Sequence, residues 1–347
     1  MAEKYSLQIL NENDYKRWNK FVSASPDGSI YSTPEYLDVL CEATSANFRI
    51  LAVIKNDEIF GGISLYERSS IFGTYVAPRL LLYYNGLVLK DFATKYPSKR
   101  SGHLIEIMSI ISEKLSKADY GRIFITNRDT VKDARVFKEK GWAIDFSYTY
   151  VVPLGNLNHL WSRVEQNLRR LIKRCLQQNV CFSKDNDFDG LFQMHLRTHH
   201  RKGSPLYLTY DKFKRYYTRL HSQNLCQIYH ARLPDGRSIA SQLVLLGTHP
   251  ITHTVCAGAD EAFLSMGANA FLRWKVFEDL SKNGYLGNDL TDAALNPVAH
   301  FKSQLGGDLR LCLNFKRSDS IRFKIRAHGG KLIKAGKKRL KRSKNKL

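Results

Sequence analysis

The segment AHFKSQLGGDLR, residues 299–310, carries a lysine, Lys302, four residues before a double glycine. A lysine can donate a proton or hold a developing negative charge, and a partly buried site would lower its pKa toward a range useful for catalysis. The alternative is a surface lysine in the last turn of a helix, where the helix dipole favours positive charge. The residues alone leave both interpretations open.

Two carboxylates precede this segment. Asp289 ends a short predicted strand, GNDL, and Asp292 follows it. Strand ends in α/β folds present functional groups, so Asp289 could orient an attacking amine or accept its proton. Asp292 fits the N-cap of the following helix equally well.

A histidine-rich stretch, HLRTHHRKGSPLY, contains His195, His199 and His200, two of them four residues apart. A metal site would need a further ligand at a suitable spacing, and none follows, so we expect no metal. Arg201, before Gly203, fits a basic loop over an acidic acceptor instead. The chain shows no Ser-His-Asp order, P-loop or Rossmann fingerprint.

A basic helix is predicted over residues 158–178. Its apolar side chains recur at helical spacing, and arginines occupy the rest of its surface. It could be a packed connecting helix with a solvated basic side. Alternatively, some of its arginines, Arg169 and Arg170 among them, bind phosphate, since a guanidinium suits bidentate phosphate contact.

The elements that must position these residues repeat along the chain. The stretch from Ser101 to Gly141 aligns with the stretch from Met266 to Gly306 at one constant offset and without a gap. The matching pairs include Gly102 and Gly267, Leu115–Lys117 and Leu280–Lys282, Tyr120 and Tyr285, Thr126 and Thr291, and Gly141 and Gly306.

Each copy has the same predicted order: a β-hairpin, a glycine, a helix, a short strand, a second helix ending at a glycine, and another strand. The hairpins turn around Asn56-Asp57 and Asp235-Gly236. We therefore expect a mixed α/β sheet fold with units at residues 1–153 and 154–315, the second opening with the basic helix. A basic tail over residues 316–347 follows.

This order, with ARVFKEKGW in the first copy, resembles the GNAT acyltransferase fold. Two such units joined by NLRRLIKRC resemble the Fem-type transferases of peptidoglycan cross-bridges and the CelD-type proteins linked to polysaccharide synthesis. Further local matches are GSIYSTPEYLDVL, GWAIDFSYTYVVPL and GANAFLRWKVFEDLSKNGY with FKSQLGG. The resemblance covers roughly residues 5 to 315.

The resemblance implies a donor site at the start of the helix after the fourth strand of the second unit, at Gly267-Ala268-Asn269. The family's Q/R-x-x-G-x-G/A pattern is incomplete there, which an aminoacyl-tRNA donor would tolerate better than coenzyme A. The family tyrosine that often acts as general acid falls at Phe137 in the first copy and at Lys302 in the second. Trp274 could be an aromatic platform for a sugar or adenine, although a core position explains it more simply.

Composition and charge limit the class of protein and the surfaces that it could bind. The 347 residues are 43% hydrophobic and 25% charged, as in a globular protein, and have no 18-residue apolar run. From the opening residues MAEKYSLQIL we expect no signal peptide. Six scattered cysteines argue against disulfides. Of the net charge of +22, residues 316–347 carry +13, from 14 Lys/Arg and one acid. This tail could be a solvated extension, or could contact RNA or inner-membrane lipid.

The prediction is a cytoplasmic Fem-like acyltransferase that could be peripheral at the inner membrane face. It would move an acyl or aminoacyl group from acyl-CoA, such as acetyl-CoA, or aminoacyl-tRNA to an amine of an anionic cell-envelope precursor. Lys302 and Asp289 would do the chemistry, with no tightly bound cofactor. The alternatives are an acetyl-CoA-dependent N-acetyltransferase acting on a nucleotide sugar or polysaccharide unit, and a non-catalytic module that binds RNA or a membrane surface.

Overall fold

The computed structural model describes residues 4–71 and 73–318. The strands are β1 (Ser6–Ile9), β2 (Asn47–Lys55), β3 (Glu58–Ser70), β4 (Gly73–Val76), β5 (Leu87–Leu89), β6 (Arg122–Thr126), β7 (Ala143–Pro153), β8 (Cys181–Asp185), β9 (Cys226–Arg232), β10 (Ser238–Leu245), β11 (Ile251–Ala259), β12 (Gly287–Asp289) and β13 (Asp308–Arg317). The helices are α1 (Tyr15–Ala24), α2 (Pro34–Thr44), α3 (Pro97–Lys117), α4 (Arg135–Glu139), α5 (Leu157–Arg163), α6 (Gln166–Gln177), α7 (Phe188–Lys202), α8 (Tyr210–Ser222), α9 (Ala268–Lys282) and α10 (Pro297–Ser303).

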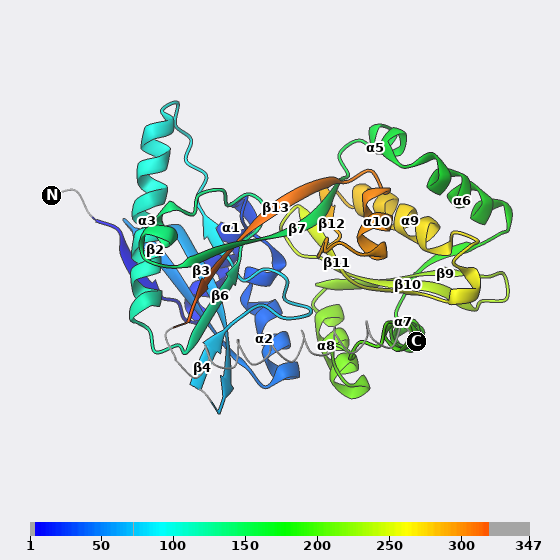
Figure 1. Cartoon of the computed structure of the whole chain (residues 1–347), viewed down its shortest axis with the longest axis horizontal. Coiled ribbons are helices and arrows are strands. Elements are labelled where there is room, and N and C mark those ends of the chain that lie inside the picture. Colours follow the sequence, from blue (N-terminus) through cyan, green and yellow to red (C-terminus); the bar gives the residue numbers. More distant parts are fainter. Residues whose placement is uncertain (1–3, 72, 319–347) are drawn as a thin grey trace, which may run out of the picture.

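One mixed sheet runs through both halves of the chain, in the order β1-β2-β3-β4-β6-β13-β7-β12-β11-β10-β9-β8, with β5 paired to β3. The last strand, β13, therefore lies between two strands of the first half. It pairs antiparallel with β6 through Asn314–Arg317 and with β7 along almost its whole length. β7 in turn pairs with β12 of the second half. Figure 1 shows β7 and β13 as a long ribbon that connects the two lobes.

Helices cover both faces of the sheet. In the first half, α1 packs on one face, and α3 and α4 pack on the other. In the second half, α7 and α8 pack on one face, whereas α5, α6 and α9 pack on the other with α10. Each half thus buries alternate strand residues between two helical layers, as mixed sheets of this kind require.

The internal repeat is present in the structure at the offset that the sequence predicts. Helices α3 and α9 end at Lys117 and Lys282, which are a matching pair, and strands β7 and β13 begin at the matching positions 143 and 308. The glycines after α4 and α10 have nearly the same left-handed backbone, with φ of 79° at Gly141 and 81° at Gly306. Glycine takes this conformation without a Cβ penalty, which explains why both copies use it to stop a helix.

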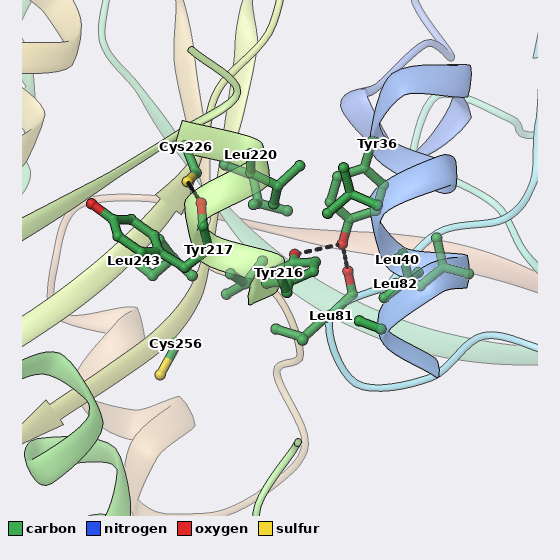
Figure 2. Packing of buried hydrophobic residues seen from close by; sticks show 14 of the residues in the cluster. Tyr36, Leu40, Leu81, Leu82, Tyr216, Tyr217, Leu220, Cys226, Leu243 and Cys256 are labelled. Atoms are coloured by element: carbon green, nitrogen blue, oxygen red, sulfur yellow. Dashed lines mark hydrogen bonds between the residues drawn. The ribbon is translucent and has the colours of Figure 1, made fainter. Parts of the chain in front are cut away.

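A shared core joins the halves where α2 meets α8. Tyr36 of α2 and Tyr216 of α8 are fully buried, and their hydroxyl oxygens lie 3.0 Å apart. The Tyr36 hydroxyl also donates to the carbonyl of Leu81 (Figure 2). These phenols therefore satisfy one another inside an apolar cluster that residues of both halves build.

The structure changes two details of the expected organisation. The predicted single helix over 158–178 is two helices, because Val164 and Glu165 adopt extended ψ angles of 133° and 138°. The predicted tail starts too early, since Lys316 and Arg317 belong to β13 and the Arg317 guanidinium donates to the Ser116 hydroxyl at 2.7 Å.

The rest of that tail, residues 319–347, lies outside the described residues. The division of the chain at 153/154 stays a prediction. Within residues 4–71 and 73–318, none of the helices combines the length and the apolar character needed to cross a bilayer.

Candidate active site

Lys302 lies in α10 and is 8% exposed, so it is not the surface lysine of the alternative interpretation. Its ammonium donates to the carbonyl oxygens of Thr291 and, at 2.6 Å, Asp292. Both carbonyls belong to a left-handed turn, with φ of 50° at Thr291 and 44° at Asp292. A β-branched residue rarely adopts this conformation, so the lysine holds a strained turn in place.

The equivalent residue of the first copy, Phe137, has a different environment. It is fully buried and stacks on Phe315, with ring centroids 4.3 Å apart. Its neighbour Trp142 packs edge-on at 5.1 Å. The first copy therefore fills this position with apolar packing, whereas the second copy places a cation there.

Asp289, at the end of β12, is 1% exposed and accepts three hydrogen bonds. They come from the Tyr84 hydroxyl at 2.7 Å, the Thr149 hydroxyl at 2.5 Å and the Thr291 backbone N–H at 2.7 Å. Burial alone would raise the pKa of Asp289, but the approach of His253 and the bonds from Thr149 and Tyr84 lower it to about 2. Asp289 is therefore a fixed carboxylate at neutral pH.

A cleft of about 260 Å³ opens beside this carboxylate, where the two halves share β7 and β13. Tyr83, Tyr84 and Arg79 line it from the first half, and Asp292 lines it from the second. Its remaining walls are Pro78, Leu80, Leu82, Phe124, Thr126, Ser147, Tyr148, Cys312 and Asn314. Asp289 reaches the cleft through Tyr84, and Lys302 lies behind the Asp292 wall.

The phenols of Tyr83 and Tyr84, which line the cleft, stay protonated at neutral pH. Burial raises the pKa of Tyr83 to about 12, and its hydroxyl bonds to the side chains of Tyr207 and Thr291. Burial, and then Asp289, raise the pKa of Tyr84 well above its usual value. Arg79 donates to the Tyr207 carbonyl at 3.4 Å. Because the Tyr84 hydroxyl already donates to Asp289, the cleft offers a ligand the Tyr83 phenol and the Arg79 guanidinium, together with the Asp292 carboxylate.

On the other side of Thr291, strands β11 and β12 separate. They pair in parallel only over Ile251–His253 and Gly287–Asp289, while β11 continues to Ala259. After β12 the chain turns toward β7, where the Leu290 N–H donates to Tyr150. Beyond His253, the edge of β11 on this side thus has no strand partner among the described residues, and an extended ligand could pair with it.

The predicted donor site lies at the start of α9, beyond that edge. Gly267 has φ of 95° and is the N-cap, and Asn269 is half-buried. A Cβ on Gly267 would lie 2.5 Å from the Leu171 Cβ, so α6 packs directly on this turn. The structure thereby brings the basic helix to the start of α9, with Arg169 half-buried and Arg170 exposed beside Leu171.

The other predicted binding residues lie elsewhere. Arg201 is exposed near the end of α7, on the opposite face of the sheet from α9. Trp274 of α9 is 8% exposed, packs against Trp161 with ring centroids 4.5 Å apart, and donates its indole N–H to Glu278. This packing is that of a core residue. A role for either residue in substrate binding stays a prediction.

Among the described residues, one cluster of side chains has metal-ligand spacing, namely Asp185, Asp187 and His230. The Arg232 guanidinium already pairs with both carboxylates, at 3.0 and 2.8 Å. Both carboxylates are thus already ion-paired with one guanidinium, which occupies the position that a cation would take.

The comparisons with known proteins agree with this geometry. Residues 162–303 match the family described as acetyltransferase (GNAT) domain. The match includes α9, β12 and Lys302, so this part of the chain is similar to a GNAT acetyltransferase domain. A search of curated proteins finds no match.

Among solved structures, FemX has a TM-score of 0.71 at 13% identity, covering 92% of this chain and 98% of its own. A tandem GNAT protein from the clavulanic acid biosynthesis pathway has a TM-score of 0.54 at 10% identity, covering 90% and 98%. L-PGS from Bacillus licheniformis has a TM-score of 0.55 at 11% identity, covering 90% and 94%. The chain thus has the Fem-like tandem GNAT fold that the sequence pattern predicts.

Sequence reasoning did not find the first-half residues of the cleft. Tyr83, Tyr84 and Arg79 come from the segment PRLLLYYNG, and Thr149 comes from β7. Two adjacent tyrosines after an apolar run were the available signal. Their importance depends on β12 lying beside β7, which no local pattern indicates.

Proposed function

We propose that the protein transfers an acyl or aminoacyl group to an amine of a cell-envelope precursor, with the acceptor in the cleft and the donor along β11. The observation that carries the proposal is the position of Lys302. Its ammonium holds the turn that separates the cleft from the open edge of β11. Donor and acceptor would therefore meet at Thr291 and Asp292.

The reaction joins the acceptor amine to the carbonyl carbon of an activated ester or thioester. The new C–N bond forms while the C–O or C–S bond to the carrier breaks. Solvent takes up the amine proton, and the carrier leaves as a hydroxyl or thiol after it gains a proton from solvent. Negative charge develops on the carbonyl oxygen in between. A fixed cation near this oxygen stabilises the transition state more than the ground state.

Each residue has a defined role in this proposal. Lys302 supplies positive charge and keeps the Thr291–Asp292 turn in place. Asp289 is a positioning residue, since its carboxylate fixes the Tyr84 hydroxyl at the cleft wall. A pKa of about 2 makes Asp289 a poor general base, so we assign proton acceptance from the amine to solvent in the cleft.

The nature of the acceptor follows from the resemblance and from the cleft. Fem-type proteins modify peptidoglycan precursors, and two proteins of similar structure are L-PGS and a putative lysylphosphatidylglycerol synthetase. Arg79 and the Tyr83 phenol suit an anionic group of an acceptor with an extended chain. Such precursors gather at the inner membrane face, where the basic residues beyond Ser318 would hold the enzyme.

The donor is the first point to test. We would titrate the intact protein with acetyl-CoA and, separately, with aminoacyl-tRNA, and measure the shift in unfolding temperature. A shift with aminoacyl-tRNA alone supports the aminoacyl form of the proposal. A shift with acetyl-CoA alone supports the N-acetyltransferase alternative, which the name of the matched domain family favours. No shift with either donor contradicts both.

The acceptor is tested in cells. Mass spectrometry of peptidoglycan and polysaccharide precursors, with and without the protein, should reveal one precursor that gains the mass of the acyl group. A chain ending at Ser318 should keep its turnover on a soluble amine and bind anionic vesicles more weakly. Unchanged vesicle binding by that chain would contradict the role proposed for the basic residues.

A further inference from the structure

The cleft between the two halves is lined by charges of both signs. Arg79 lines it from the first half and Asp292 from the second, and its other lining side chains are neutral. The charged atoms of the two residues lie more than 4.0 Å apart, so they do not pair with each other. Among the described residues, neither forms an ion pair with any other side chain. A ligand in this cleft therefore meets one positive and one negative group.

The guanidinium of Arg79 has uncharged partners in the described part of the chain. Its N–H groups donate to the Leu80 carbonyl at 3.2 Å, to the Tyr66 hydroxyl at 3.4 Å and to the Tyr207 carbonyl at 3.4 Å. These long bonds to neutral acceptors leave the positive charge unbalanced. A carboxylate, which accepts two parallel N–H bonds from a guanidinium, would be a stronger partner than any of them.

The segment that carries Arg79 is fixed by contacts of its own. Arg79 and Leu82 form an antiparallel bridge, with N–H to carbonyl bonds of 3.1 and 2.9 Å. Leu81 between them has φ of 74°, and the buried Tyr36 hydroxyl donates to its carbonyl (Figure 2). A leucine persists in this strained conformation where its surroundings hold it. The backbone of Arg79 thus has one fixed position at the wall of the cleft.

The internal repeat shows that a neutral amide can occupy the position of Asp292. The alignment of the two copies pairs Asn127 with Asp292. Asn127 is fully buried, and its side-chain amide accepts the Leu87 N–H at 3.0 Å and donates to the Leu313 carbonyl at 3.0 Å. The first copy thus uses this position for structure, without a charge.

The carboxylate of Asp292 is exposed at the cleft instead. Its Oδ1 accepts the Ala294 N–H at 3.1 Å, a bond that an amide oxygen could also accept. Its Oδ2 accepts no hydrogen bond from the described residues. Lys302 donates to the backbone carbonyl of Asp292 at 2.6 Å. The carboxylate therefore projects from the turn at which donor and acceptor would meet, and the turn itself does not require its charge.

The volume of the cleft limits how much of an acceptor it can hold. It measures about 260 Å³, less than the roughly 300–1,000 Å³ of sites that enclose a drug-sized ligand. An amino-acid unit fits this space, and the remainder of a larger precursor would lie outside it. The two charges would then contact the reacting end of the acceptor.

We propose that the cleft takes a zwitterionic acceptor end, with the reacting primary amine at Asp292 and a carboxylate, a few bonds away, at Arg79. The inference rests on the proposed function in assigning the acceptor to this cleft. An ammonium donates to the Asp292 carboxylate, and the guanidinium binds the ligand carboxylate in a bidentate manner. One guanidinium balances one negative charge, which favours a carboxylate over a doubly charged phosphate. The amine is then at the turn that Lys302 holds, where the donor carbonyl would arrive.

The test compares ligands of matched length on the intact protein. β-Alanine and γ-aminobutyrate carry both charges, propylamine and butylamine carry the amine alone, and propionate and butyrate carry the carboxylate alone. O-Phosphoethanolamine replaces the carboxylate by a phosphate. Calorimetric titration without a donor measures binding, and steady-state turnover with the donor measures use as an acceptor.

The variants change one charge at a time. Asp292→Asn copies the first half, and Arg79→Gln removes the guanidinium. Asp292→Glu and Arg79→Lys keep the charges. Asp211→Asn and Arg215→Gln, at exposed positions of α8, are the matched controls. Thermal unfolding without ligand checks that each variant is folded.

We expect the two amino acids to bind wild type at least about tenfold more tightly than the amines and the carboxylates do. In Asp292→Asn their affinity should fall to that of the plain carboxylates, and in Arg79→Gln to that of the plain amines. The charge-keeping variants should recover part of each loss, and the controls should match wild type. With the donor present, both losses should appear in KM for the acceptor more than in kcat.

The proposal is overturned if the amino acids bind no better than the amines, or if Asp292→Asn and Arg79→Gln bind them as wild type does. Tighter binding of O-phosphoethanolamine than of the amino acids overturns the assignment of a carboxylate. Turnover with unchanged KM in both variants ends this inference and leaves the proposed function standing. Conversely, amino-acid binding that depends on both residues, without turnover on any donor, keeps the site and ends the transferase.

Discussion

Replacing Lys302 with methionine tests the site most directly, because methionine keeps most of the volume and removes the charge. The ammonium makes two hydrogen bonds to backbone carbonyls, each worth roughly 1.5–3 kcal/mol when the donor is charged. Burying the ammonium costs several kcal/mol, which offsets most of that gain. We therefore expect the free energy of unfolding to fall by no more than about 2 kcal/mol.

Catalysis should respond more strongly than stability. Losing one preorganised donor to a developing oxyanion typically lowers kcat by about 10²–10³-fold, and we expect a loss in that range with KM for the acceptor little changed. The assay is steady-state turnover with whichever donor shifts the unfolding temperature. Lys138→Met, which removes an exposed lysine of α4 beside the equivalent position in the first copy, is the matched control.

Two results would refute this reasoning. A Lys302→Met protein with full kcat would show that the lysine only supports the turn or plays no part. A loss of activity that tracks the loss of folded protein, measured by thermal unfolding in the assay buffer, would reduce Lys302 to a structural residue.

Three further predictions concern the scaffold. Burial, and then Arg128, lower the pKa of His249 from 6.5 to about 3. Between these pH values His249 is therefore protonated in the unfolded chain and neutral in the folded chain. Stability should therefore fall as pH drops from 6.5 toward 3, by up to about 1.4 kcal/mol per pH unit, and denaturant unfolding should show a shallower dependence for His249→Asn. Gly267→Ala should cost about 1–3 kcal/mol, because φ is 95° and the new Cβ would meet Leu171; an unchanged denaturation midpoint would contradict this packing. Tyr36→Phe should cost about 1–3 kcal/mol by leaving buried acceptors unsatisfied while keeping one cooperative transition, whereas two separate transitions would show that the halves fold independently.

The sequence predicted the parts of the fold that depend on local patterns. The presence of α3 and α9, the glycines after α4 and α10, and the short strand that contains Asp289 follow from helical spacing, left-handed glycines and short apolar runs. The alignment of the two copies also showed that the position of Phe137 in the first copy is occupied by Lys302 in the second. Local patterns could not show that Lys302 is buried, because burial depends on the turn at Thr291, 11 residues earlier in the chain.

For the same reason, the sequence could not predict which strands far apart in the chain pair with one another. The position of β13 between β6 and β7 depends on contacts between residues far apart in the chain, such as Asn314 and Thr126. Neither strand carries a pattern that selects the other half as its partner. The partners of Asp289, namely Tyr84 and Thr149, therefore also stayed hidden, since both come from the first half.

The shared strands explain why a unit without the lysine is retained. β7 belongs to the first copy, yet its Thr149 holds the Asp289 carboxylate of the second, and its backbone carbonyl at Tyr148 accepts the Ala293 N–H of the turn that Lys302 supports. The hydroxyl of Tyr84, also in the first copy, donates a hydrogen bond to the same carboxylate. The first copy thus supplies one wall of the cleft and backbone carbonyls that accept hydrogen bonds on either side of the turn. Chemistry at one turn needs a single cation, so the first copy can have a phenylalanine, Phe137, at the position equivalent to Lys302. Both copies are still needed to hold that turn in place.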